Sequence, residues 1–366
     1  MMMNKELNFM IIRYILIVIL WLTLTGCGSE RIVNKIDLVH TIGYDQIGDN
    51  IKASILVGDY KEKETMSATM YVANARSELG LMPALNTKTM GALEYGQLDM
   101  LIFGKDYART GVEAVMNNLC HDPKISTRMQ LAVADREAYD LLKASQVSQN
   151  SFLLSSLLRQ NMKEGNLPEH NFHIALYDYY GKGRDLFAPY LIMEQNQAKL
   201  DGLALFRRDK YITHISLNQA LLLKLLLQNA RNGSYRLQLQ LQENRKSETV
   251  LQINSSKVSY KFIKQKRSPL VSIQLDITAH IEDMPQASED QQAQQFRELE
   301  NKVRKQLTTD LEKFIALCKD KRVDPMGLSD YVLRHTKQIR NAGTEHPAFT
   351  EEIHVNLNIL ETGYGQ

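Results

Sequence analysis

The 366-residue chain holds 44 basic and 42 acidic residues, which give a formal net charge of +2. A charge this small argues against nucleic acid or any other strongly charged polymer as a partner. Apolar residues make up 44% of the chain, which is enough for a sizeable core. The length exceeds what one core usually organises, so we expect two or three domains.

Residues 1–26 have the layout of a secretory signal peptide. A polar, basic start precedes an apolar run over residues 14–24, and the small residues Thr25 and Gly26 follow. This order of zones is typical of a cleaved export signal. The apolar run is well short of the ~20 residues that a helix needs to cross a bilayer, so a permanent transmembrane anchor is the weaker interpretation.

The end of this segment carries a candidate modification site. Leu24-Thr25-Gly26-Cys27 resembles the bacterial lipobox, in which a Cys thiol receives diacylglycerol and the bond before it is cut. We expect signal cleavage between Gly26 and Cys27 and lipidation of Cys27; export without a lipid is the competing interpretation. Because one acyl chain alone binds a membrane only marginally, two chains are needed for a stable anchor. The mature protein is then expected on the outer face of a bacterial cytoplasmic membrane.

The first half of the chain predicts a mixture of strands and helices. Strands at 36–43 and 51–57 flank the turn-forming residues 48–50, which indicates a hairpin. Four further elements are expected at 98–104 (strand), 107–119 (helix), 129–134 (strand) and 148–180 (helical).

The second half is richer in strands. The predicted elements are a hairpin (202–206 with 211–215), a helix (217–228), two strands with clean apolar and polar alternation (237–241 and 271–281), two more helices (296–318 and 328–339) and a final strand (353–359). The apolar residues of the helix at 296–318 advance by three or four and form one stripe. Core packing under the sheet is favoured for this stripe, with a partner or membrane as the alternative.

These elements predict an α+β, multi-domain fold of two to three mixed α/β domains. We expect residues 1–26 to be the signal peptide and residues 27–198 to form an N-terminal region of one or two subdomains. Residues 199–366 should form a C-terminal α+β domain, an antiparallel sheet covered by long amphipathic helices.

The motifs of common enzymes are missing from the sequence. It contains no Gly-x-Ser-x-Gly elbow, no His-Glu-x-x-His, no phosphate-binding Gly-rich loop and no Cys-x-x-Cys. His170 and His173 are three residues apart on a predicted helix and would suit one metal, but no further ligand adjoins them. We therefore predict no catalytic site, no metal site and no cofactor.

Two other polar segments need an interpretation. Gly181-Lys182-Gly183-Arg184 has residues that would suit phosphate binding, but it follows a predicted helix, whereas anions favour the start of a helix. We therefore interpret it as the loop that ends the helix. Cys120 and Cys318 match no metal-ligand spacing; buried free thiols are favoured, and a disulfide between them stays open.

Taken in order, several stretches resemble the Ger(x)C family, the lipoprotein C subunits of bacterial spore germinant receptors. The stretches are Leu24–Cys27, Val39–Asp45, Leu98–Arg109 with Gly111, Asp122-Pro123, Gly202–Lys210, Asp324–Gly327 and Ile353–Gly363. They extend over nearly the whole mature chain. Gly28-Ser29 follows the lipid site, where family members commonly have Trp-Asp. The difference lies in the short flexible segment directly after the lipidated residue.

The resemblance implies a specific setting for the protein. It implies an extracytoplasmic subunit that works beside two integral-membrane partners, the A and B subunits, in a receptor that responds to small nutrients. The site of action would be the inner membrane of the spore. The resemblance also implies three mixed α/β domains without an established catalytic site. We expect a role in assembly and response of the receptor, without direct binding of the nutrient and without nucleic acid.

Two other classes of protein remain as alternatives. A solute-binding lipoprotein of a transporter would need two similar α/β lobes around a cleft, and the strand-rich second half does not resemble the first. An envelope hydrolase would need a clustered acid, base or nucleophile, which the sequence does not display.

Overall fold

The computed structural model describes residues 13–14, 36–59, 67–242, 245–282, 289–336 and 347–360. The predicted cleavage site and Cys27 lie outside the described residues, as does the predicted signal peptide apart from residues 13 and 14. Residues 37–366 cluster as one unit, and the description below concerns that unit.

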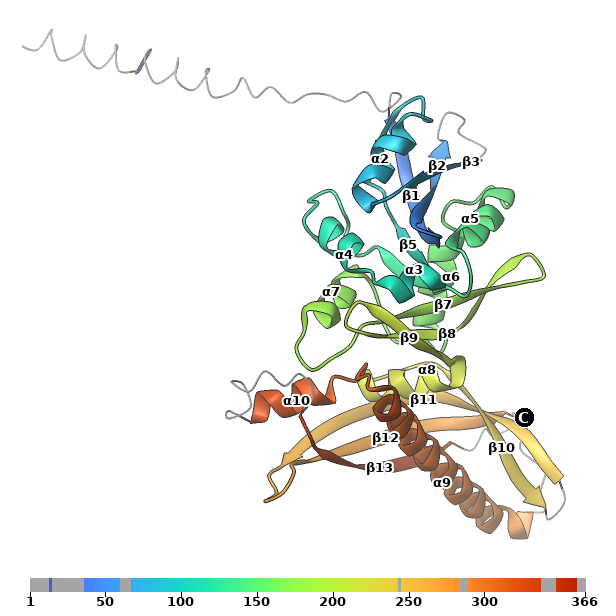
Figure 1. Cartoon of the computed structure of the whole chain (residues 1–366). Helices are drawn as coiled ribbons and strands as arrows, with labels where there is room; N and C mark the ends of the chain where they lie inside the picture. The colour runs from blue at the N-terminus through green and yellow to red at the C-terminus, as the bar shows by residue number, and fades with distance from the viewer. Residues whose placement is uncertain are drawn as a thin grey trace, which may run out of the picture. The chain divides into compact units, whose positions relative to one another are not determined.

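In the described part of the chain, the first sheet has nine strands in the order β3-β2-β1-β5-β6-β7-β8-β9, with β4 paired to β1 (Figure 1). The strands are β1 (Ile36–Ile47), β2 (Asn50–Asp59), β3 (Ser67–Ala75), β4 (Ala92–Glu94), β5 (Met100–Gly104), β6 (Gln130–Ala134), β7 (Phe187–Glu194), β8 (Gln197–Arg207) and β9 (Lys210–Ser216). Strands β1, β5, β6 and β7 are parallel, and antiparallel strands extend the sheet on both sides. The predicted hairpin of β1 and β2 is confirmed, and so is that of β8 and β9.

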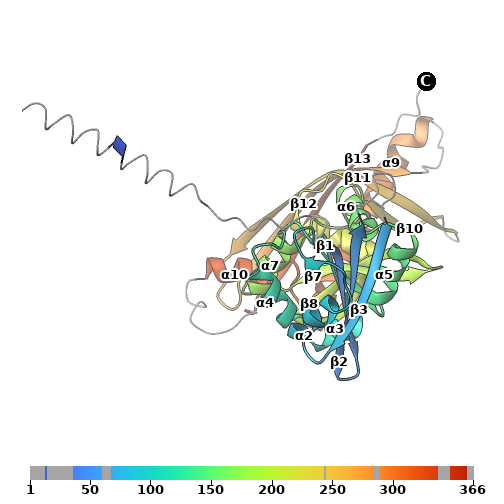
Figure 2. The ribbon, with the colours of Figure 1, turned by 90° about the horizontal axis from the view of Figure 1, so that it is seen from above.

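Helices cover both faces of this sheet. One face carries α5 (Ala138–Val147) and α6 (Leu153–Lys163), whereas the other carries α2 (Glu78–Asn86), α3 (Lys105–Thr110), α4 (Glu113–Cys120) and α7 (Phe172–Tyr180). Figure 2 shows α5 on one side of the strands and α4 and α7 on the other. Every residue of β5 and β6 is buried, as expected for parallel strands that are covered on both faces.

Two predicted helices are interrupted. The helix expected at 107–119 is two helices, α3 and α4, because Gly111 between them has a φ of 129°. A Cβ at Gly111 would lie 2.2 Å from Asp209 Oδ2, so the break accommodates the β8–β9 turn. Likewise the helical segment expected at 148–180 consists of α6 and α7 with an irregular link.

The second sheet has the order β10-β11-β12-β13. Its strands are β10 (Ser234–Gln242), β11 (Arg245–Ile263), β12 (Leu270–Glu282) and β13 (Thr350–Ile359). The first three are antiparallel as predicted, but β13 pairs parallel to β12, so the expectation of an entirely antiparallel sheet is wrong at its last strand. The helices α9 (Glu289–Lys321) and α10 (Leu328–His335) lie between β12 and β13 in the chain. They form the crossover that a parallel pair requires.

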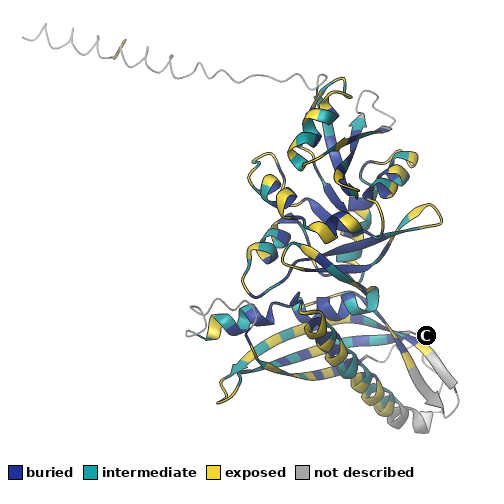
Figure 3. Ribbon diagram, viewed as in Figure 1, coloured by how far each residue is buried: buried dark blue, intermediate teal, exposed yellow. Residues whose placement is uncertain are grey.

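The predicted stripe on α9 belongs to the core. Val303, Leu307, Leu311, Phe314 and Cys318 are buried in the same apolar cluster as the inward-facing residues of β12. In Figure 3, dark blue residues alternate with lighter ones along the strands of the second sheet. The core interpretation of the stripe is therefore confirmed.

Helix α8 (Leu217–Leu227) joins the two sheets. Residues 220–226 are all buried, and the helix contacts β8 and β9 of the first sheet as well as β10 and β11 of the second. Apart from Lys224, whose Nζ donates to the Gly165 carbonyl at 2.6 Å, these buried residues are apolar and require cover on all sides of the helix. Among the described residues, no helix combines the length and hydrophobicity needed to span a membrane.

The predicted boundary at 198/199 lies within β8, which pairs with β7 on one side and with β9 on the other. The first sheet thus continues to Ser216, where α8 begins. The domain boundary at 198/199 remains a prediction. In the structure, both sheets contact α8.

Candidate functional site

A joint between the two sheets brings together three segments that are distant in the sequence. The loop after α7, the turn between β8 and β9, and the link from α9 to α10 exchange hydrogen bonds through residues 183–185, 207–208 and 321–330. These segments include Gly181–Arg184, part of the stretch Gly202–Lys210 and the stretch Asp324–Gly327 that the sequence singled out.

Arg184 connects the two sides of the joint. Its Nη1 donates to Asp178 Oδ1 at 2.9 Å, and its Nη2 donates to Asp330 Oδ2 at 3.0 Å. The guanidinium carbon lies 4.5 Å from the ring centre of Tyr177. Burial raises the pKa of Asp178 to about 6, although the Arg184 guanidinium acts in the opposite direction. The interpretation of residues 181–184 as a helix end is confirmed, since Gly181 is the C-cap of α7.

Two buried aspartates hold the backbone of the joint. Asp185 Oδ2 accepts from the backbone N–H of Asp324 at 2.7 Å, and Asp185 Oδ1 accepts from that of Arg208 at 3.2 Å. Asp324 in turn accepts from the N–H groups of Leu328 and Ser329, which begin α10. Burial raises the pKa of the Asp324 carboxyl, and its bonds to these N–H groups oppose the shift. Asp324 therefore caps the start of α10, and Asp185 ties two loops together, so both carboxylates have a structural role.

Gly327 allows the segments to approach closely. Its φ is +69°, and a Cβ at this position would lie 2.7 Å from Arg184 Nη2. A side chain here would meet both a backbone penalty and the guanidinium of Arg184.

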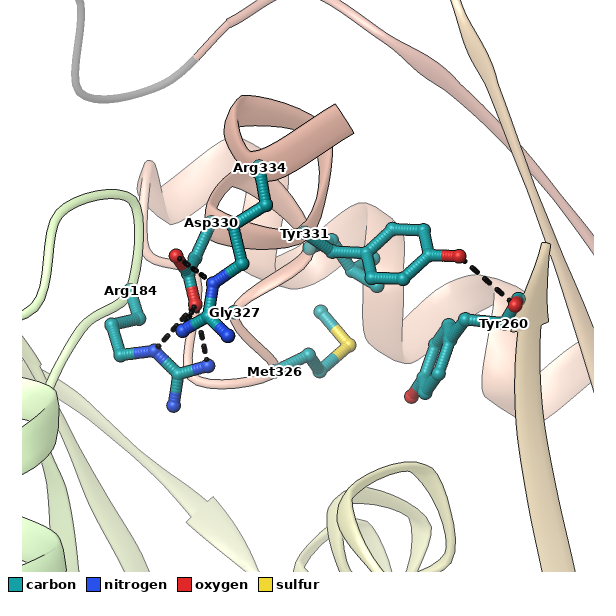
Figure 4. A pocket seen from close by; sticks show the side chains of 8 residues that line it. Arg184, Tyr260, Met326, Gly327, Asp330, Tyr331 and Arg334 are labelled. Carbon is teal, nitrogen blue, oxygen red and sulfur yellow. Dashed lines mark hydrogen bonds and ion pairs between the residues drawn. The ribbon is translucent and has the colours of Figure 1, made fainter. Parts of the chain in front are cut away.

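A small pocket opens beside the joint (Figure 4). Its volume is about 160 Å³, and it is lined by Arg184, Tyr260, Met326, Gly327, Leu328, Asp330, Tyr331 and Arg334. The two guanidinium groups lie on one side with Asp330 between them, and Met326 and the two tyrosines lie on the other. Arg334 Nε donates to Asp330 Oδ1 at 2.9 Å, and its Nη2 donates to the Tyr177 hydroxyl at 2.8 Å.

The predicted polar candidates do not form a common site. His170 precedes α7, whose N-cap is Asn171, whereas His173 lies in the first turn and is exposed, so the two do not share a helix face. His170 is buried, and neither of its ring nitrogens has a hydrogen-bond partner among the described residues. Burial lowers its pKa to about 4, and the Phe187 backbone only partly opposes this. Within the described ranges, no group of three His, Cys, Asp or Glu side chains is placed to hold a metal.

The two cysteines in the described part of the chain are free thiols. Cys318 is buried under the second sheet, and Cys120 is half-buried at the end of α4. The disulfide that the sequence left open is not formed in this structure.

A buried serine and histidine form a pair that the sequence analysis did not identify. His40 Nδ1 lies 2.7 Å from Ser151 Oγ, and His40 Nε2 lies 3.0 Å from Gln97 Oε1. The imidazole also stacks on Phe152 with 4.3 Å between ring centres, and it is 1% exposed. The arrangement is that of a buried polar link between β1 and the loop before α6, rather than of a nucleophile that faces a substrate. Its only sequence signal was the position of His40 within Val39–Asp45.

A polar depression of about 350 Å³ lies at the carboxyl ends of the parallel strands. Asp45 at its base accepts from the N–H groups of Ala138 and Tyr139 at the start of α5. A Cβ at Gly104 would lie 2.1 Å from Asp45 Oδ1. Asp45 and Gly104, both within stretches that the sequence analysis singled out, therefore fix the packing of α5 on the sheet.

Each half of the chain matches a known protein family. Residues 29–193 match the family described as the spore germination protein N-terminal domain. Residues 201–363 match the family described as spore germination B3/GerAC like, C-terminal. The chain belongs to the Ger(x)C family.

Individual relatives cover most of this Ger(x)C chain. Spore germination protein GerQC of Bacillus cereus is 27% identical over 333 residues, which span 89% of this chain and 91% of the relative. The putative spore germination protein YfkR of Bacillus subtilis (strain 168) is 21% identical over 351 residues, 90% of each chain. The crystal structure of the GerBC protein matches with a TM-score of 0.55 and 15% identity, and covers 87% of this chain and 96% of that one. At that identity the likeness concerns the fold, which is mixed α/β with two sheets.

Proposed function

We propose that this chain is the lipid-anchored C subunit of a nutrient germinant receptor. The observation that carries the proposal is that germination-protein families match both halves of the mature chain, 29–193 and 201–363. The lipobox that ends at Cys27 lies directly before the matched region. Lipid on Cys27 would hold the subunit on the outer face of the cytoplasmic membrane, the inner membrane of the spore.

Within the receptor, we assign the chain to assembly and response beside the integral-membrane A and B subunits, not to catalysis or primary nutrient sensing. The charged side chains at the joint pair with one another, as Arg184 does with Asp178 and Asp330. The pocket beside them, at about 160 Å³, is smaller than the ~300–1,000 Å³ usual for small-molecule sites. The depression at the carboxyl ends of the parallel strands is larger, at about 350 Å³, but its lining is polar, whereas small-molecule sites are mostly apolar. Neither of these two pockets has both the size and the lining expected of a nutrient site.

A solute-binding lipoprotein is the second candidate, and the fold gives it little support. Such a protein needs two similar lobes around a cleft, whereas here one sheet is mixed, with nine described strands and helices on both faces, and the other has four described strands. The family matches name germination proteins for both halves.

The anchoring part of the proposal is tested by Cys27→Ala. We expect the variant to be uncleaved or released, and spores that carry it to lose the response to one class of nutrient. Cys120→Ala, at a half-buried thiol, is the matched control and should remain in the membrane fraction. If Cys27→Ala stays membrane-bound after high-salt washing and its spores germinate normally, the lipid is dispensable.

The role in the receptor is tested by purification of the full-length chain from spore membranes. The A and B subunits should accompany the wild-type protein. The soluble chain from residue 28 onward should show no strong heat of binding with common amino acids or sugars. Micromolar binding of a nutrient, lost on mutation of a few pocket residues, would favour the solute-binding alternative.

A further inference from the structure

The pocket beside the joint has two guanidinium groups at one end and apolar surface at the other (Figure 4). We propose that it receives an acidic residue and its apolar neighbour from a partner protein of the receptor. This inference rests on the proposed function, since it presumes that the chain works in a complex. It goes further, because it names one docking point and the chemistry that fits it.

Two guanidinium groups and one carboxylate line the pocket, and Asp178 behind Arg184 balances the remaining charge. Arg184 and Arg334 contribute two guanidinium groups, whereas Asp330 between them is the one carboxylate in the lining. Arg184 is largely buried and also pairs with Asp178, outside the pocket. Arg334 is 61% exposed, and its Nη1 makes no hydrogen bond within the described residues. A second carboxylate at the mouth would therefore find an available guanidinium donor on Arg334.

The opposite end presents apolar surface. Met326 and Leu328 line it together with the rings of Tyr260 and Tyr331, whose centres are 5.7 Å apart. The tyrosine hydroxyls are already engaged, because Tyr331 donates to the Tyr260 carbonyl at 3.0 Å and Tyr260 donates to the Leu226 carbonyl. His335 packs against the Tyr331 ring with 4.4 Å between ring centres, so the carbon surface that remains in the pocket favours one apolar side chain beside the carboxylate.

The rim points to a protein as the source of these groups. Tyr177, 49% exposed, receives the hydrogen bond from Arg334 and lies over the Arg184 guanidinium. Exposed Tyr and Arg around a small pocket are the composition found at the energetic centres of protein interfaces. A volume of about 160 Å³ suits one or two anchoring side chains better than a whole nutrient with its contacts.

The lining of the pocket comes from elements attached to both sheets. Its walls come from Arg184 after α7, from Tyr260 on β11 and from residues 326–334 at the start and along the face of α10. A bound residue would thus contact elements attached to both sheets. Docking would add to the links that hold the joint closed.

Charge reversal at the exposed guanidinium tests the proposal. Full-length chains with Arg334→Glu, Arg334→Gln and Arg334→Lys are purified from spore membranes, and the A and B subunits recovered with each are measured. We expect Arg334→Glu to reduce recovery at least several-fold, Arg334→Gln to reduce it less, and Arg334→Lys to stay closest to wild type. Arg136→Glu, at an arginine that is 85% exposed and does not line this pocket, is the matched control and should have no effect.

A second measurement examines the pocket without the partner. The soluble wild-type chain is titrated with 3-phenylpropanoate and with its neutral amide, and tyrosine resonances are followed by NMR. The acid should bind in the millimolar range and the amide at least tenfold more weakly, with acid binding lost in Arg334→Glu. Thermal unfolding of each variant identifies a folding defect, and the conservative Arg334→Gln remains informative if Arg334→Glu unfolds.

The outcomes separate the two proposals. If the wild-type chain recovers neither A nor B, the proposed function fails, and the titration still decides whether the pocket selects a carboxylate. If wild type and a folded Arg334→Glu variant recover both subunits equally, the docking point is wrong while the proposed function stands. Equal binding of the acid and the amide would also overturn the assignment of a carboxylate.

Discussion

Arg184 Nη2 donates to Asp330 Oδ2 at 3.0 Å across 146 positions of sequence. The bond links the loop that ends α7, on the first sheet, to α10, which precedes the last strand of the second. Both groups are largely buried, and each has a second partner, since Arg184 also pairs with Asp178 and Asp330 also pairs with Arg334. Removal of any one member therefore changes a network of four charges, three of them largely buried, which makes the joint a suitable place for single substitutions.

Asp324→Asn should destabilise the soluble chain by about 1–3 kcal/mol, since an amide offers one acceptor oxygen where the carboxylate accepts from both Leu328 and Ser329. Denaturant unfolding measures the change. Asp320→Asn, at a carboxylate that is 75% exposed, is the control and should stay within ~0.5 kcal/mol of wild type. Equal effects of the two variants would show that Asp324 does not hold the start of α10.

Gly327→Ala should destabilise the chain more than Gly48→Ala. Both glycines have a positive φ, which costs an L-residue roughly 1–2 kcal/mol, but a Cβ at Gly48 would meet nothing within 4 Å. The Cβ at Gly327 would displace the Arg184 guanidinium, so the excess cost should shrink in an Arg184→Ala background. A double-mutant cycle in denaturant measures this coupling, and an excess that persists without Arg184 would place the strain elsewhere.

Leu307→Ala should destabilise the chain by about 2–5 kcal/mol, because this α9 residue is fully buried under the second sheet. Leu79→Ala, at a leucine that is 77% exposed, should change stability by less than ~0.5 kcal/mol. The same unfolding assay compares them. A change in stability at Leu307 as small as that at Leu79 would mean that the α9 stripe is an exposed surface and not part of the core.

His170 should make the protein less stable as the pH falls. Its pKa is about 4 in the folded chain because of burial, but near 6.5 in the unfolded chain. Between these two pH values the unfolded state binds a proton at this histidine and the folded state does not. The His170 contribution to stability is thus intact above pH 6.5 and falls by about 2 kcal/mol by pH 5.

The difference between wild type and His170→Gln isolates this contribution. Asp45 and Asp178, whose pKa values burial raises to about 6, act in the opposite direction, since their protonation favours the folded chain as the pH falls. The pH slope of unfolding free energy should be smaller in His170→Gln and unchanged in the exposed variant His173→Gln. Identical slopes for wild type and His170→Gln would mean that this histidine is accessible to protons in the fold.

Elements with a regular period were predictable from the sequence. The stripe of α9 and the alternation of β12 follow from the helical and strand repeats, and both are confirmed. Strand β11 was missed because its alternation is broken. The register with β12 shifts between Ile253 and Ser255, so the buried positions change from Leu251 and Ile253 to Ser256.

The contacts of the joint have no local signature in the sequence. The end of α7 at Gly181 was predictable, but the pairing of Arg184 with a residue 146 positions away was not. The break at Gly111 likewise depends on the approach of Asp209 from another hairpin. For the same reason the pocket was not foreseen, since its lining comes from three separate segments.

Helix α8 has a consequence for how the chain reaches its folded state. Residues 220–226 contact β8 and β9 on one side and β10 and β11 on the other. A chain that is made from its N-terminus presents this leucine-rich segment before the later strands have been added. Until they are, the segment is an exposed apolar surface through which chains aggregate. The two sheets should therefore complete their folding together, and either half produced alone should aggregate or be degraded.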